Sequence, residues 1–147
     1  MKRIVQISFI LTLLLAFNVF NANAQCKGFA KKICKEELGA YTHDGNYHAA
    51  ILVEGEEAEL YKTFYSDQDY RLAICGSDNL PAIEFTVMDA NSNILYSNAD
   101  NDYGRTWDFN LESSQQLKIV IKVTTFEQQA DDPASGCVAI MFGIMTQ

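Results

Sequence analysis

After Gly39, the sequence consists of short apolar or alternating segments at regular spacing, separated by clusters of Gly, Asn, Asp and Ser. The clearest segment is 117–123 (LKIVIKV). Its apolar residues Leu117, Ile119, Ile121 and Val123 alternate with a second set that includes Lys118 and Lys122. A period of two residues is that of a β-strand with one buried face. We predict eight strands, at residues 47–53, 57–65, 70–75, 83–88, 93–97, 106–110, 117–123 and 137–145.

The spacing of these strands is typical of sandwiches and barrels. No long helical period separates them, which argues against a parallel α/β fold. We predict an all-β fold, an antiparallel, jelly-roll-like β-sandwich of about eight strands. Residues 83–97 are expected to form a hairpin around the turn 89–92. Residues 137–145 are almost wholly apolar, as expected of a strand in the middle of a sheet.

The first 24 residues have the three parts of a signal peptide. A basic start, Met1-Lys2-Arg3, precedes an apolar run, and the run closes on the small-x-small pattern Ala22-Asn23-Ala24. We predict export to the periplasm or the extracellular space with cleavage after Ala24, and no membrane span after cleavage. The remaining residues, 25–147, are expected to form a single domain.

The charge of the chain restricts its partners. The net charge is −8, and the predicted signal peptide contains two of the eleven cations and none of the nineteen acids, so cleavage leaves −10. Nucleic acid is not an expected partner, because phosphate binding requires clustered Lys and Arg. The hydrophobic share of 48% excludes a disordered chain.

Four cysteines, Cys26, Cys34, Cys75 and Cys137, follow the predicted cleavage point. An even number in an exported chain favours two disulfides over free thiols. Zinc sites favour close pairs such as C-x2-C, and the sequence has none.

Residues 25–38 have a helical pattern, with the first two cysteines, Phe29, Ala30, Ile33 and Leu38 near one face. In a continuous helix, eight residues would separate Cys26 from Cys34 by about 12 Å. A disulfide spans at most about 6.8 Å between Cα atoms, so each would have to pair with Cys75 or Cys137. A frayed first turn at Gly28 leaves the Cys26–Cys34 pairing open. We favour a helix bonded to the main body.

Several segments resemble the bacterial pre-peptidase C-terminal domain, a small β-sandwich attached to secreted peptidases. The similarity lies in residues 64–72 (FYSDQDYRL), 85–89 (FTVMD), 93–97 (NILYS) and 117–121 (LKIVI). The chain also resembles small exported proteins of Bacteroidota, in which Gln often follows the signal peptide. The first resemblance implies a non-catalytic accessory or binding role. The chain departs from that family in lacking a preceding peptidase and in its cysteine-bearing helix.

Two polar segments suggest sites for ligands. Asp89, Asn91 and Asn93 match the opening of a calcium loop, and Asp100 and Asp102 could add oxygen ligands. Ile94, however, replaces the glycine of such a loop, and a turn rich in Asp and Asn needs no ion. No cofactor is therefore expected, with calcium as the secondary hypothesis.

Aromatic rings suggest a binding surface. Tyr103, Arg105 and Trp107 lie beside an acidic loop and form the best candidate for an exposed one. The alternative is that most rings of the chain fill the core or its ends. Both histidines, His43 and His48, fall in a turn rich in Gly and Asn, a context that favours a structural role.

We predict a non-catalytic module of the cell envelope that binds a protein or a glycan. The sequence has no G-x-S-x-G motif, and its Glu54–Glu59 run resembles a solvated turn more than a glycosidase pair. The alternatives are a structural or assembly factor that packs against a partner subunit and, third, an envelope hydrolase.

Overall fold

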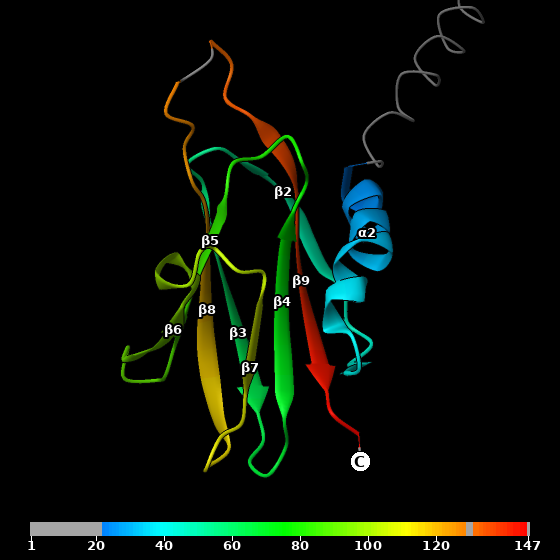
Figure 1. Ribbon diagram of the computed structural model, residues 1–147, viewed down its shortest axis with the longest axis vertical. Helices are drawn as coiled ribbons and strands as arrows, with labels where there is room; N and C mark the ends of the chain where they lie inside the picture. The colour runs from blue at the N-terminus through cyan, green and yellow to red at the C-terminus, as the bar shows by residue number, and fades with distance from the viewer. Residues whose placement is uncertain (1–21, 129–130, 147) are drawn as a thin grey trace, which may run out of the picture.

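The structure is a computed structural model that describes residues 22–128 and 131–146. The predicted signal peptide therefore lies outside the described residues, except for its last three. The described strands form two antiparallel sheets that pack face to face (Figure 1). The predicted all-β sandwich is confirmed.

The first sheet contains five strands and the second contains four. In the first, β9 pairs with both β1 and β2 on one side and with β4 on the other, and β7 follows β4. In the second, the order is β3-β8-β5-β6. The bounds are β1 Thr42–His43, β2 His48–Val53, β3 Glu57–Phe64, β4 Tyr70–Gly76, β5 Ile83–Met88, β6 Ile94–Ser97, β7 Thr106–Phe109, β8 Gln115–Val123 and β9 Ser135–Ile144.

The eight predicted strands match β2 to β9 to within two residues at each end, and the short β1 was not predicted. The predicted hairpin is confirmed as β5 and β6, which among the described strands are the one consecutive pair that are neighbours in a sheet. All other connections from β2 onward cross between the sheets, which gives the strand order of a jelly roll. The central position predicted for residues 137–145 is also confirmed, in β9.

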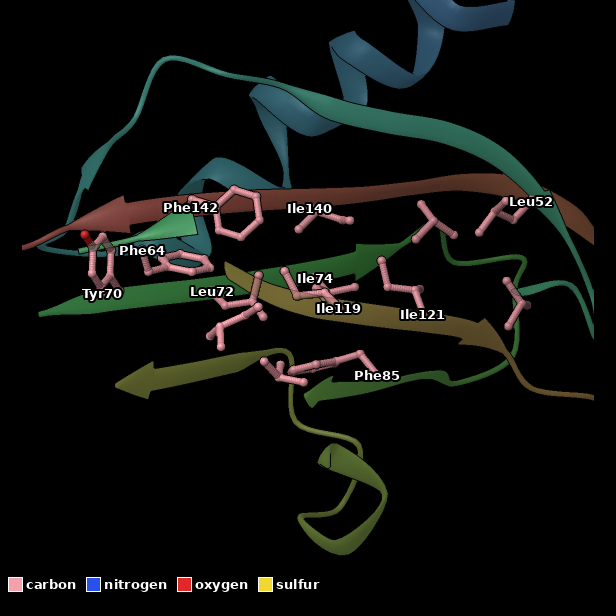
Figure 2. Packing of buried hydrophobic residues seen from close by; sticks show 14 of the residues in the cluster. Leu52, Phe64, Tyr70, Leu72, Ile74, Phe85, Ile119, Ile121, Ile140 and Phe142 are labelled. Carbon is pink, nitrogen blue, oxygen red and sulfur yellow. The ribbon is translucent and has the colours of Figure 1, made fainter. Parts of the chain in front are cut away.

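The main core lies between the two sheets (Figure 2). Alternate residues of β8, which include Leu117, Ile119 and Ile121, meet Leu72 and Ile74 of β4 there. Aromatic rings extend this core at one side in a continuous series, from Phe64 and Tyr70 through Phe109, Trp107 and Tyr96 to Phe85. Most rings of the predicted strands thus fill the interior.

A helical layer covers the outer face of the five-stranded sheet (Figure 1). It consists of α2, Ala22–Lys32, and the 3-10 helix η1, Cys34–Leu38. The prediction of one continuous helix over 25–38 is wrong, because the winding changes at Ile33. The tighter winding of η1 keeps Cys34 and Leu38 buried against the sheet and leaves Ile33 48% exposed, although the pattern placed it on the buried face.

Two disulfides attach this layer to the sheet. Cys26 of α2 is bonded to Cys137 of β9, and Cys34 of η1 is bonded to Cys75 of β4. The prediction of two disulfides that join the helix to the main body is therefore confirmed. Together with the burial of Ala30, Cys34 and Leu38, they hold the helical layer on β4 and β9. Such bonds are typical of chains that mature in an oxidising compartment outside the cytoplasm.

Removing the bond that closes the longer loop should test this attachment. The Cys26–Cys137 bond closes a loop with a sequence separation of 111, and a native disulfide of this kind usually stabilises a small exported domain by about 2–5 kcal/mol. We expect C26A/C137A to lose stability in that range in urea unfolding, with faster amide exchange in α2 than in the sheets. An unchanged free energy of unfolding would show that packing and the Cys34–Cys75 bond suffice to hold the helix.

Candidate functional site

The connection from β6 to β7 is organised by one buried polar side chain, Asn98. Its Oδ1 accepts a hydrogen bond from the backbone N–H of Phe85 at 2.7 Å, and its Nδ2 donates to the carbonyls of Ile83 and Gly104 at 2.9 and 3.1 Å. Its own carbonyl accepts from the N–H groups of Asn101 and Tyr103. Asn98 thus binds the loop 98–105 to the edge of β5, and its hydrogen-bonding groups are satisfied although it is 1% exposed.

This loop contains two consecutive residues in the left-handed region. Asp102 and Tyr103 have φ angles of 52° and 53°, a conformation that non-glycine residues rarely adopt. Such backbone strain is found preferentially at binding and active sites, where the surrounding structure maintains it. Here it leaves the Tyr103 side chain 44% exposed to solvent.

Tyr103 and Arg105 line a cavity of about 320 Å³ at the end of β4. Its other lining residues come from the end of β4, the β4–β5 connection and the start of β5: Ile74, Gly76, Ser77, Asp78, Leu80, Pro81, Ala82 and Ile83. Gly76 is required here, because a Cβ atom at this position would lie 2.7 Å from the Ile83 side chain. The cavity therefore combines apolar side chains, such as Leu80 and Ile83, with one ring, one cation and one carboxylate.

Arg105 is anchored by its backbone and carries a largely free side chain. Its carbonyl accepts a hydrogen bond from the N–H of Ile74, and its guanidinium contacts the Glu37 carboxylate at 3.2 Å. The Arg105 side chain is 53% exposed, and ion pairs this exposed contribute little to stability. The guanidinium is thus available to a partner, and exposed Tyr and Arg beside a pocket are typical of residues that dominate protein binding.

Trp107, the third residue of the predicted surface, does not belong to it. Its ring stacks on Phe109 at 4.3 Å and on Tyr96 at 5.0 Å, and it packs against the main core. It points inward because it lies on β7 opposite Leu72, whose side chain also faces the core. The structure thus brings Tyr103 and Arg105 together and separates Trp107 from them.

The five proposed calcium ligands lie in two separate places. The Asp89 carboxylate accepts hydrogen bonds from the N–H groups of Asn91 and Asn93 and from the Asn93 side chain, which closes the β5–β6 turn. Asp100 and Asp102 follow β6, whose four residues span about 13 Å. Calcium binds its oxygens at about 2.3–2.6 Å, so the two groups cannot share one ion in this arrangement.

Within residues 22–128 and 131–146, there is no group of three or more His, Cys, Asp or Glu side chains placed to hold a metal ion. Calcium binding therefore stays a prediction without a ligand geometry to support it.

The two histidines lie at the same end of β2, near a partly buried ion pair. The Asp44 carboxylate contacts Lys62 Nζ at 2.8 Å and accepts a hydrogen bond from the N–H of Asn46. Burial alone would raise the pKa of Asp44, but these hydrogen bonds outweigh it and hold the pKa below its usual range. His43 Nε2 lies 2.9 Å from the carbonyl of Asn46. These contacts give the turn 43–47 a structural role.

The site also includes residues that the sequence analysis missed, chiefly Asn98, Asp78 and Leu80. Five of the six residues 97–102 are polar, and Asn98 is one of them. The sequence of this segment does not show which of these polar side chains is buried. Asp78 and Leu80 precede β5, far from the loop in sequence. The one sequence feature that could have indicated these two residues is their position in the connection 77–82, between two predicted strands.

Replacing Asn98 should test its role in the loop. Asn98→Ala would leave the buried N–H of Phe85 and two carbonyls without partners, and an unsatisfied buried group costs about 1–3 kcal/mol. We expect a loss of stability in that range in urea unfolding, with faster amide exchange at 98–105. Asn101→Ala, which removes an exposed bond to the Ser97 carbonyl, is the matched control and should lose much less.

Stability should depend on pH through His48. Burial lowers the pKa of His48, and nearby Asp44 opposes this effect only in part. The unfolded chain therefore binds a proton at higher pH than the folded one, and stability is lost as pH falls below about 6.5. We expect the free energy of unfolding to fall from pH 7 to pH 5, with a smaller slope in His48→Gln. Equal slopes in the two proteins would contradict this assignment.

Comparisons with known proteins show similarity in fold. No protein family and no curated protein matches the chain in sequence. Among solved structures, the crystal structure of PliG from Aeromonas hydrophila, a periplasmic lysozyme inhibitor of g-type lysozyme, superposes with a TM-score of 0.50. The two are 16% identical, and the match covers 72% of this chain and 88% of PliG. At this identity, the similarity to PliG is one of architecture.

Proposed function

We propose that this chain is an exported, non-catalytic protein-binding module of the periplasm, and that it holds a cationic cell-wall hydrolase through the loop 98–105. The observation that carries the proposal is the presentation of Tyr103 and Arg105 beside a cavity of mixed polarity by a strained loop that Asn98 holds in place. A rigid loop loses little entropy on binding, so such a surface is prepared for a partner.

The charge of the sandwich supports a cationic partner. Beyond Gly39, the chain holds seventeen of the nineteen acidic residues and only five cations, a net charge of −12. Four of these five cations already contact carboxylates: Lys62, Arg71, Arg105 and Lys118. An excess of this size accelerates association with a positively charged protein, and the effect weakens as salt increases.

The fold of PliG supports the class of partner. PliG is a periplasmic inhibitor of g-type lysozyme, so a sandwich of this architecture serves there as a protein-binding module. A g-type lysozyme is therefore the first hydrolase to test here.

The alternative role in assembly lacks a comparable observation. An assembly factor would be expected to have a broad exposed apolar face. In the described residues, the exposed large apolar side chains are instead spread over separate segments, such as Ile51 of β2, Ile94 of β6 and Phe126 of the β8–β9 connection. Scattered apolar side chains are normal on a protein surface. A protein-binding role through the loop 98–105 is therefore favoured.

Two substitutions test the proposal. The exported protein, purified from the periplasm, is titrated against a g-type lysozyme in a lytic assay and by calorimetry. Tyr103→Ala should weaken binding by about 30-fold or more, as expected for a central aromatic contact, and Arg105→Ala should weaken it as well. Tyr65→Ala is the matched control, because Tyr65 is also exposed but lies at the opposite end of β4 and should leave affinity unchanged.

Three outcomes would contradict the proposal. Absence of binding to g-type lysozyme and to other cationic hydrolases would reject the class of partner. Equal losses in Tyr103→Ala and Tyr65→Ala would reject the site. Selective retention on a glycan array would favour a sugar ligand.

A further inference from the structure

The helical layer has the opposite charge to the sandwich that it covers. Residues 25–39 contain four lysines and two glutamates, a net charge of +2, against −12 for the rest of the chain after the predicted cleavage. The lysines are Lys27, Lys31, Lys32 and Lys35, here called the lysine patch. They represent four of the nine cations that remain after cleavage, within a span of nine residues.

The lysine patch is exposed and not neutralised by carboxylates. All four side chains are exposed. In the described part of the chain, none of the four has a carboxylate oxygen within 4 Å, in contrast to most cations of the sandwich. Lys27 and Lys31 lie over the Tyr47 ring, at 5.9 and 5.3 Å from its centroid, which leaves their charge unchanged. Of the two glutamates, Glu37 is held by Arg105.

The fold presents this patch as a rigid outer surface. Figure 1 shows α2 lying along the outside of the sheet, beside β2 and β9. Both disulfides hold the layer there, and its opposite face is buried through Ala30, Cys34 and Leu38. Ile33 lies half-exposed between Lys32 and Cys34, so the surface combines positive charge with one apolar side chain.

Distance separates the patch from much of the acidic surface. The outer face of the four-stranded sheet, with Glu57, Glu59 and Glu84, lies on the far side of both sheets. The helical layer, the five-stranded sheet and the four-stranded sheet are stacked, and neighbouring layers lie about 10 Å apart. These carboxylates are therefore about 20 Å from the lysines. At physiological salt the Debye length is about 8 Å, so their repulsion of an anionic surface that touches the patch is largely screened.

We propose that the lysine patch is a membrane-contact surface that holds the protein against anionic phospholipid headgroups. Clusters of four or more exposed basic residues on helical segments are typical of peripheral contact with anionic lipid, and the exposed Ile33 fits the boundary between headgroups and acyl chains. In this orientation the helical layer faces the bilayer. The far face of the sandwich then points away from it.

Vesicle co-sedimentation tests the proposal with a matched pair of variants. The exported protein is mixed with vesicles of phosphatidylcholine, with or without phosphatidylglycerol, at low and high salt. K31Q/K35Q and K118Q/K122Q lower the net charge equally, but the first pair lies in the patch and the second on the four-stranded sheet. We expect binding to anionic vesicles at low salt only, and a loss of about tenfold or more in K31Q/K35Q alone.

Each other result would overturn the proposal. Failure of the wild-type protein to sediment with anionic vesicles at low salt would show that the patch is solvated. Equal losses in the two variants would assign binding to net charge. Retention on immobilised duplex DNA without vesicle binding would assign the patch to another polyanion. None of these outcomes depends on the lysozyme assay, since the patch lies outside the loop 98–105.

Discussion

Burial on both faces of β4 and β9 is the constraint on which the rest of the structure depends. Inward side chains of β9, such as Val138 and Phe142, fill the core between the sheets, while Ala139 and Met141 face the helical layer. Both strands also carry a disulfide cysteine, Cys75 in β4 and Cys137 in β9. Because the two cores share these strands, the helix, the sheet and the sandwich interior are held as one unit.

Much of this architecture could be predicted from the sequence, because burial determines the pattern of each strand. The alternation in 117–123 and the apolar run in 137–145 correspond to one buried face in β8 and two in β9. Helix geometry argued against a Cys26–Cys34 bond, although a frayed first turn at Gly28 left that pairing open. The two possible pairings with Cys75 and Cys137 could not be separated, because the choice depends on where the helix lies on the sheet. The break at Ile33 arises from the same tertiary contacts.

The site was less predictable than the fold. Tyr103 and Arg105 were recognised from their residue types, whereas Trp107 has the same local signal and lies in the ring series of the core. Trp107 lies on the core-facing side of β7, whereas Tyr103 and Arg105 lie in the loop before that strand. Asn98 determines the conformation of this loop through hydrogen bonds to β5 and Gly104. The excess of acidic residues could be predicted from the composition. The distance between these residues and the lysine patch could not, because it depends on where the helix packs on the sheet.

These features form one arrangement. A disulfide-bonded sandwich with an acidic body presents a strained loop beside a cavity of mixed polarity. A basic helical layer covers the outer face of the five-stranded sheet, opposite the core. The loop and the layer meet at the ion pair between Arg105 and Glu37.

Hydrogen–deuterium exchange is the most direct test of the central claim that the loop 98–105 is the recognition surface. Exchange is measured in the exported protein alone and with a saturating g-type lysozyme. The account predicts slower exchange at residues 77–82 and 98–105, which border the cavity, and no change in the β3–β4 connection at the opposite end of β4. Protection confined to other surfaces, or no protection at any lysozyme concentration, would contradict it.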